Sequence, residues 1–202
     1  MKNFLLPILL LASLNLLSQN YLFDTNSSGF SVGGQLTSNN GSTLIAAIPS
    51  YTSNGKLTFG FGIGYESNDD LDLNSTAIKP SISYLVLKQG ENNNPVSVGL
   101  NGSFQYNTFS DFDGLTGNTI GFGASLHHEI NASETVKIIP GGAVGWNKIT
   151  IRQDGNNIGD DSGITYGILG TVAFNKFYVE PSLLFSEGNS VFVLSFGIIF
   201  PK

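Results

Sequence analysis

The chain has 202 residues and a formal net charge of −6 at pH 7, and only 12% of its residues are charged. This charge argues against nucleic-acid binding, which requires a basic surface. The absence of cysteine excludes disulfides, thiolate metal sites, a cysteine nucleophile and a lipid anchor on a cysteine.

The N-terminus has the composition of an export signal. Lys2 precedes an apolar run, Phe4 to Ala12, that is too short to cross a bilayer as a helix, and no later stretch reaches about 18 consecutive apolar residues. We expect residues 1–18 to be a cleaved signal peptide, residues 19–28 a short periplasmic segment, and residues 29–200 one β-barrel domain.

From Gly29 onward, apolar and polar residues alternate in runs bounded by Gly, Asn, Asp and Ser, which is the pattern of half-buried strands. The clearest run is F-G-F-G-I-G-Y, from Phe59 to Tyr65. We expect strands at 29–37, 43–51, 57–65, 77–87, 96–106, 119–130, 135–149, 164–174, 177–185 and 191–200. Ten strands are predicted, with eight as the alternative. Prolines within these runs, such as Pro80 and Pro181, are expected to cause local bulges or bends.

The residues opposite the apolar ones are mostly Gly, Ser, Thr and Asn, which is typical of a barrel lumen and unlike a charged, water-facing surface. The larger polar side chains expected to face the lumen are Lys79, Asn101, Gln105, Glu129, Lys137 and Glu180. Because a short turn joins their strands, we expect Glu129 and Lys137 to be in contact.

The last strand, V-F-V-L-S-F-G-I-I-F, has one very apolar face that ends in Phe200. A strand at the end of the chain needs a partner on both edges, and the first strand is the one with a free edge. Their pairing predicts a closed, antiparallel, up-and-down transmembrane barrel whose apolar face contacts lipid.

The connections also divide into two classes. Short turns are expected at 53–55, 89–95, 131–134 and 175–176 on the periplasmic side, and longer external loops at 67–76, 107–118 and 152–162. The aromatic residues expected to form the outer interfacial girdle are Tyr65, Tyr106, Trp146, Tyr166 and Phe185.

Acidic residues concentrate in the expected external loops, at Asp69, Asp70, Asp72, Asp111, Asp113, Asp160 and Asp161. We interpret them as solvated loop tips; the alternative is a set of oxygen ligands for divalent cations that bridge to lipopolysaccharide phosphates. Their spacing matches no EF-hand loop, so neither a metal site nor a cofactor is predicted.

His127 and His128 are adjacent, so on a strand they point to opposite faces and cannot line one site. We expect His127 in the lumen and His128 toward lipid, both near the periplasmic end and away from the acidic loops. An omptin-type protease or an outer-membrane phospholipase is therefore disfavoured, and no catalytic residue is predicted.

Several stretches resemble a known family. The export signal, the run Phe59 to Tyr65, the run I-K-P-S-I-S-Y from Ile78 to Tyr84 and the final F-G-I-I-F are similar to the small porin-like outer-membrane barrels of Bacteroidetes. The resemblance spans nearly the whole mature chain. It implies location in the bacterial outer membrane and offers no catalytic residues.

The sequence therefore predicts an integral outer-membrane barrel that is either a narrow passive pore or a structural or surface-interaction protein. The alternatives are a soluble periplasmic ligand-binding barrel of the lipocalin type and, less favoured, a barrel enzyme. Expected partners are outer-membrane lipid and lipopolysaccharide, the barrel assembly machinery through the last strand, and small ions or solutes.

Overall fold

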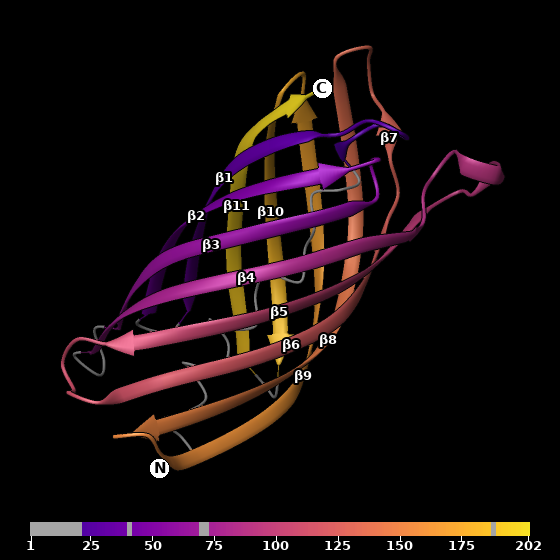
Figure 1. The fold of residues 1–202 in the computed structure, drawn as a ribbon. Helices are drawn as coiled ribbons and strands as arrows, with labels where there is room; N and C mark the ends of the chain where they lie inside the picture. Colours follow the sequence, from indigo (N-terminus) through magenta and orange to yellow (C-terminus); the bar gives the residue numbers. More distant parts are fainter. Residues whose placement is uncertain (1–21, 40–41, 69–72, 187–188) are drawn as a thin grey trace.

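The computed structural model describes residues 22–39, 42–68, 73–186 and 189–202, most of which lie in strands (Figure 1). The strands are β1 (Gly29–Asn39), β2 (Ser42–Ser53), β3 (Leu57–Asn68), β4 (Leu73–Leu87), β5 (Ser97–Phe109), β6 (Leu115–His127), β7 (Ile130–Asn131), β8 (Val136–Gln153), β9 (Asn156–Phe174), β10 (Phe177–Ser186) and β11 (Asn189–Pro201). A short 3-10 turn, η2 (Glu91–Asn93), lies between β4 and β5. Within the described ranges, no helix is long and apolar enough to span a membrane.

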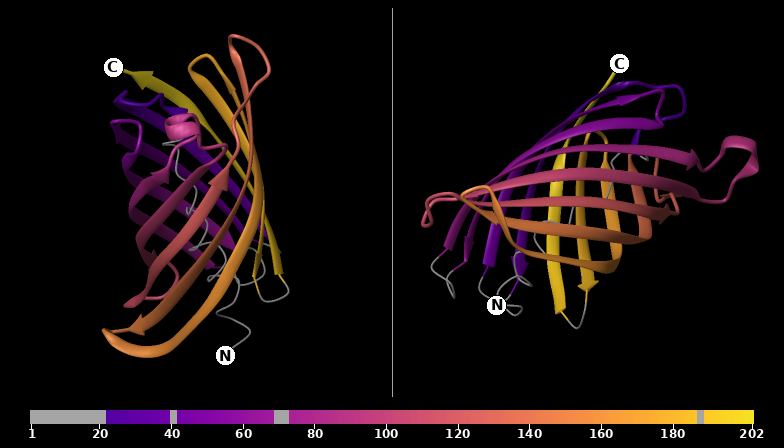
Figure 2. Two further views of the ribbon diagram at one scale, coloured as in Figure 1. Left: turned by 90° about the vertical axis from the view of Figure 1, so that its right-hand side faces the viewer. Right: turned by 60° about the horizontal axis from the view of Figure 1, so that its bottom comes forward.

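The strands form one closed antiparallel barrel. Each long strand pairs with the next along the chain, and β1 pairs with β11 from Gly29 opposite Pro201 to Ser38 opposite Phe192. Pairing between β6 and β8 completes the ring, so the barrel has ten long strands and the two-residue β7 is an addition to it. The predicted closure by the last strand and the ten-strand topology are confirmed, and the eight-strand alternative is wrong. We call the end where β1 starts and β11 finishes the terminal end, and the opposite end the distal end (Figure 2).

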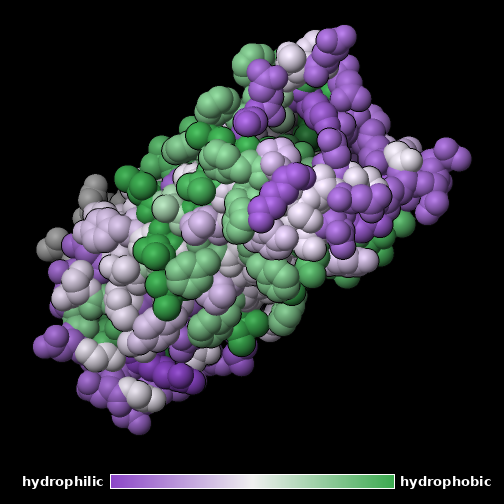
Figure 3. Space-filling view, turned by 45° about the horizontal axis from the view of Figure 1, so that its top comes forward, coloured by the Kyte–Doolittle hydropathy of each residue, from purple (hydrophilic) through white to green (hydrophobic). Residues whose placement is uncertain are grey.

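The outer wall is apolar and the inner wall is largely polar. On β3, Phe59, Phe61 and Ile63 are exposed on the outside, whereas Thr58 and Glu66 are buried on the inside. The same alternation continues through β11, where Phe192, Phe196 and Phe200 are exposed. Figure 3 shows hydrophobic side chains across the middle of the visible face and hydrophilic ones at both ends. This is the distribution that a bilayer requires of a barrel wall.

The strands extend farther at the distal end than the alternation predicts. β5 continues to Phe109 and β6 begins at Leu115, while β8 and β9 are separated only by Asp154 and Gly155. The long loops expected at 107–118 and 152–162 are therefore mainly strand. On β9 the reason is that residues 156–163 are only exposed or half-exposed, so no apolar period marks this part of the strand, yet its backbone still pairs with β8. The prediction of short terminal-end turns is correct at Asn175 and Lys176 but wrong for 89–95, because the connection from β4 to β5 spans 88–96, carries η2 and projects from the barrel (Figure 2).

The prolines interrupt the ladder without shifting its register. Pairing of β9 with β10 is missing between Val179 opposite Val172 and Ser182 opposite Leu169, where Pro181 lies. Pro140 explains in the same way why β6 ends at His127 although pairing resumes in β7. His128 lies opposite Pro140 and donates its amide N–H to the Pro140 carbonyl, but Pro140 has no N–H to donate to the His128 carbonyl. The expected bulges are thus gaps in hydrogen bonding.

Apolar clusters pack inside the barrel toward both ends. At the distal end, Leu73 and Phe109 pack with Ile149 and Ile151. Near the terminal end, Phe23 packs with Ala173, Tyr178 and Ile199, and Leu85 packs with Ile139. Between these clusters the inner wall carries mainly hydroxyl and amide side chains.

Candidate functional site: the lumen and its terminal mouth

A short segment before β1 enters the terminal mouth of the barrel. This segment, Leu22–Ser28, is called the strap below. The Phe23 ring is buried at 3% exposure against Tyr178 and Ile199, and Leu22 packs against the same cluster and against the cluster of Leu85 and Ile139. These contacts come from β4, β8, β10 and β11, so the strap is held by strands on different sides of the lumen.

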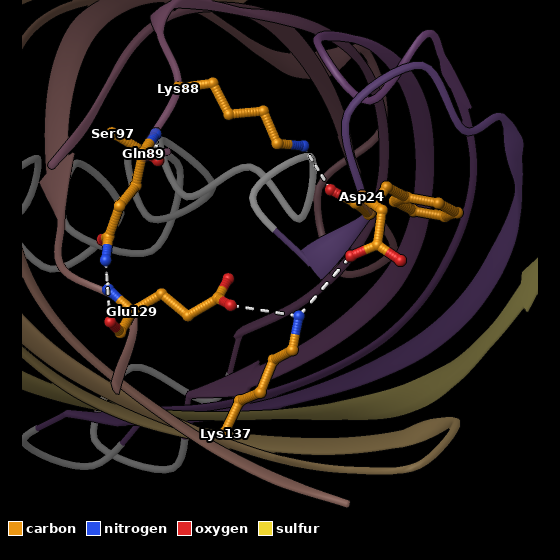
Figure 4. A network of polar contacts seen from close by, with 7 residues as sticks. Asp24, Lys88, Gln89, Ser97, Glu129 and Lys137 are labelled. Atoms are coloured by element: carbon orange, nitrogen blue, oxygen red, sulfur yellow. Dashed lines mark hydrogen bonds and ion pairs between the residues drawn. The ribbon is translucent and has the colours of Figure 1, made fainter. Parts of the chain in front are cut away.

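Lys88, directly after β4, fixes the backbone of the strap. Its ammonium donates to the Phe23 carbonyl (Figure 4). It also donates to the Gly55 carbonyl at 3.0 Å, and the side chain is buried. Gly55 has φ of +62°, and a Cβ there would lie 2.2 Å from the Asp24 carbonyl oxygen. Only glycine therefore allows the turn after β2 to approach the strap this closely.

Charged side chains continue this network across the mouth. Lys137 on β8 lies 3.1 Å from Glu129 and 3.6 Å from Asp24, measured between ammonium nitrogen and carboxylate oxygen (Figure 4). The predicted contact between Glu129 and Lys137 is thus confirmed, although Glu129 lies in the gap between β6 and β7. Gln89 holds Glu129 in place by a reciprocal pair of bonds, accepting from its N–H at 2.6 Å and donating to its carbonyl at 2.8 Å.

The electrostatic environment of Lys88 is unusual for a lysine. The pKa of its ammonium is lowered from 10.5 to about 8, mainly by burial; the carboxylates of Asp24, Glu91 and Glu129 act to raise it, and the charge of Lys137 acts to lower it. Desolvation is the dominant cause because it penalises the charged form.

Polar side chains on the inner wall bond mainly to neighbours on the wall itself. Gln35 donates to Thr37 at 2.9 Å, and the hydroxyl oxygens of Thr52 and Thr58 lie 2.7 Å apart. This lining offers mainly neutral hydroxyl and amide groups, which are both donors and acceptors of hydrogen bonds.

The structure places the larger side chains predicted for the lumen in two groups. Lys79, Asn101, Gln105 and Glu180 are buried on the inner wall, where Gln105 donates to Asn107 at 2.8 Å and Glu180 accepts from Thr171 at 2.5 Å. Glu129 and Lys137 lie at the terminal mouth instead. The six residues do not form one cluster.

The acidic residues are dispersed over the distal end. Asp69, Asp70 and Asp72 lie outside the described residues. Asp111 accepts from the Asn74 amide N–H at 2.8 Å, and the Asp113 carbonyl accepts from Gln153 at 2.5 Å. Asp160 and Asp161 belong to β9, not to a loop, and Asp160 lies 3.7 Å from the Lys148 ammonium. Among the described residues, no group of three or more His, Asp or Glu side chains could hold a metal ion.

The aromatic girdle residues lie on the outer face. Tyr65, Trp146 and Tyr166 are exposed, Tyr106 and Phe185 are half-buried, and the rings of Tyr166 and Phe185 stack at 5.6 Å. His127 is buried at 1% exposure, and His128 is exposed with its Nδ1 2.9 Å from the Pro95 carbonyl. His127 is the last residue of β6 and His128 follows it, both at the terminal end, whereas the loop with Asp111 precedes the distal end of β6, so the structure does not bring them together.

Sequence reasoning missed the strap and its anchors. Phe23, Asp24 and Lys88 lie outside every alternating run, so periodicity assigns them no face. A partial signal exists in Asn54-Gly55, because a turn of this kind permits close approach by another backbone.

Comparison with solved structures identifies the fold. The beta domain of the Bordetella autotransporter Brka superposes with a TM-score of 0.55 at 9% identity, covering 88% of this chain and all of that one. The chain has the fold of an outer-membrane β-barrel. Two further outer-membrane proteins also match. Ail of Yersinia pestis has a TM-score of 0.44 at 12% identity, covering 89% of this chain and 100% of that one. An outer membrane channel from Pseudomonas putida F1 has a TM-score of 0.48 at 12% identity, covering 88% of this chain and 97% of that one. No protein-family model and no curated protein matches the sequence.

Proposed function

We propose that this protein is an integral outer-membrane barrel that forms a narrow, passive pore for water and small polar solutes. The observation that carries the proposal is the combination of an exposed apolar belt on the outer wall with an inner wall of hydroxyl and amide groups. A soluble ligand-binding barrel of the lipocalin type has the opposite arrangement. As part of this proposal, we assign the chain to the small porin-like barrels of Bacteroidetes that its sequence resembles.

The belt supports a location in the outer membrane, with the terminal end in the periplasm. In that location the protein contacts lipid and lipopolysaccharide, and its assembly depends on β11, which closes the ring against β1. The Pro201-Lys202 tail remains part of this pairing, because Pro201 lies opposite Gly29 and the Lys202 N–H donates to the Ser28 carbonyl at 2.7 Å.

The strap is the proposed constriction of the pore. It adds the buried Phe23 ring and the Asp24 carboxylate to the terminal mouth, beside Lys88, Lys137 and Glu129 of the barrel. A passage through the lumen is therefore restricted at the periplasmic side, and small unitary conductance follows.

Planar-bilayer recording of the refolded protein tests this function. We expect small, ohmic unitary currents in wild type and larger ones in the double variant Phe23→Ala/Lys88→Met, which loosens the strap. A matched control is Lys148→Met, at the distal end, which leaves the strap intact. Silence of wild type and the double variant alike would overturn the pore and leave the structural or surface-interaction function.

A further inference from the structure

We propose that the outer wall of the barrel carries a binding site for one anionic phospholipid, whose acyl chain fills a hollow over β9–β11 and whose phosphate lies at Lys176. The proposal rests on the proposed membrane location and not on the pore. It names the class of lipid that binds and the place where it binds. It is carried by an apolar hollow on the exposed wall and by lysines at the terminal ends of the strands that line this hollow.

The hollow lies where β9, β10 and β11 run side by side, and it has a volume of about 220 Å³. Its lining includes the outward-facing residues Ile168, Gly170, Pro181, Leu183 and Phe192. Ile168, Leu183 and Phe192 are exposed on the outer wall. The hollow therefore opens away from the lumen, toward the surroundings of the barrel.

The hollow is a step between small and large side chains. Gly170 and Pro181 lie where pairing between β9 and β10 is missing, and a Cβ placed on Gly170 would meet no atom within 4 Å. In the next outward-facing row, Ile168, Leu183 and Phe192 lie opposite one another across the three strands. These three large side chains form one side of the hollow, and the two small residues form its floor.

An acyl chain is the occupant that suits this hollow. In the proposed location the apolar outer wall faces hydrocarbon, where no water is available to fill a depression. An unfilled depression loses dispersion contacts, because the atoms of its lining have no partners on one side. A flexible acyl chain can follow the step and restore these contacts. A smooth part of the wall offers a chain no such gain, so the chain is held here in preference.

Lys176 lies at the distance from the hollow that a phospholipid requires. It belongs to the two-residue turn between β9 and β10, and Pro181 is five residues farther along β10. Five residues of a strand span about 17 Å, which is a depth of about 13 Å for a strand tilted by about 40°. One leaflet contributes about 15 Å of hydrocarbon. A phospholipid with its phosphate at Lys176 therefore places the end of its acyl chain at the hollow.

Lysines at the terminal ends of these strands select an anionic head group. Lys176 is exposed, and its carbonyl accepts from the Ile199 N–H at 2.7 Å, which ties the turn to β11. Lys202 follows β11, and its ammonium lies 5.2 Å from the centroid of the Phe30 ring on the outer wall. Glu134, on the neighbouring turn before β8, adds one carboxylate. A phosphate gains from both ammonium groups, whereas a zwitterionic head group brings a cation that offsets this gain.

Native mass spectrometry of the detergent-purified barrel tests the hollow. The probes are phosphatidylglycerol, which is anionic, and phosphatidylcholine with the same acyl chains. We expect wild type to retain one phosphatidylglycerol, with a Kd about fivefold lower than that for phosphatidylcholine. Gly170→Leu fills the hollow and should raise the Kd for both lipids by about threefold, the effect of losing several dispersion contacts.

The matched control for Gly170→Leu is Gly102→Leu. Gly102 lies on the outer wall of β5, where a Cβ would make ordinary contacts of 3.6 Å with Ile82 and Phe122. The control adds the same side chain to a part of the wall without the hollow. Its lipid binding should equal that of wild type.

A second pair of variants tests the head group without touching the hollow. Lys176→Gln should raise the Kd for phosphatidylglycerol by about fivefold and leave that for phosphatidylcholine unchanged. Lys148→Gln makes the same change in net charge at the distal end, and it should leave the binding of both lipids unchanged.

The outcomes separate the lipid site from the proposed function. Equal binding of the two lipids by wild type, or wild-type binding in Gly170→Leu and Lys176→Gln, would overturn the site, while a conducting barrel would keep the pore. A dimer in the spectra of wild type that is lost in Gly170→Leu would place a second copy of the chain over the hollow and also overturn the lipid site. The expected losses in Gly170→Leu and Lys176→Gln, in a barrel silent to ions, would support the site and contradict the pore.

Discussion

Lys88 couples the strap to the barrel through two backbone carbonyls, those of Phe23 and Gly55. Replacement by Met keeps most of the apolar stem but leaves both carbonyls without this donor. We expect Lys88→Met to lower the free energy of unfolding by about 1 to 3 kcal/mol and to expose the strap to proteases. Urea titration in lipid vesicles and limited proteolysis measure these effects. Equal stability and protection in the variant would show that packing of Phe23 alone holds the strap.

The pH dependence of the strap follows from the same residue. The pKa of Lys88 is about 8 with the strap in place and 10.5 when the side chain is free in solvent. Protonation therefore opposes the closed mouth, and closure is favoured as the pH rises from about 8 toward 10.5. We expect protease cleavage of the strap to decrease between pH 7 and pH 9, after correction for protease activity. The decrease should be absent in Lys88→Met.

The turn between β9 and β10 provides a test at the scale of an element. Asn175 has φ of 52°, in the left-handed region that Asn tolerates and β-branched residues avoid. Asn175→Gly should be close to neutral, whereas Asn175→Val should destabilise the barrel by about 1 to 2 kcal/mol. Folding yield and urea midpoints of the two variants measure the difference, and equal midpoints would contradict the turn geometry.

The exposed apolar row of β3 provides a second test. Phe61 lies in that row, so in the proposed membrane location an arginine at this position must enter hydrocarbon. We expect Phe61→Arg to cost about 2 to 4 kcal/mol, and Phe61→Leu to be tolerated. Refolding into vesicles at graded urea concentrations compares them. Equal midpoints for the two variants would mean that this row does not face lipid.

The sequence predicts a strand well where the two faces of the strand lie in different surroundings, because apolar and polar residues then alternate along it. The run from Phe59 to Tyr65 alternates strictly because the outer wall of the barrel is apolar and the inner wall carries small or polar residues, and the predicted strand starts at Leu57 as observed. The distal part of β9, with Asp160 and Asp161, is exposed or half-exposed on both faces. Its residues therefore do not alternate between apolar and polar, and the pattern does not predict its backbone pairing.

The candidate sites were less predictable than the strands. Phe23 and Lys88 meet across 65 positions of the sequence, and only the closed ring brings them together. The alternation predicts that Ser103 and Asn101 face inward, but it does not determine which residues of β6 and β8 lie beside them.

At the scale of the whole molecule, the two ends differ in charge. The terminal mouth balances Lys88 and Lys137 against Asp24 and Glu129, whereas the described distal end carries Asp111, Asp113, Asp154, Asp160 and Asp161 against Lys148 and Arg152. An acidic rim raises the local concentration of cations. A conducting barrel should therefore prefer cations.

Replacing acidic residues of the distal rim by neutral ones tests whether the charge of the rim causes this cation preference. We expect Asp111→Asn/Asp161→Asn to shift the reversal potential in a KCl gradient toward zero. The shift should be larger at about 0.01 M salt than at 1 M, because the screening length falls from about 30 Å to about 3 Å. Glu134→Gln, an exposed substitution at the terminal end, removes a carboxylate away from the rim and should shift it less. The absence of a shift at both salt concentrations would locate the selectivity in the lumen, at groups such as Glu180 that solvent does not screen.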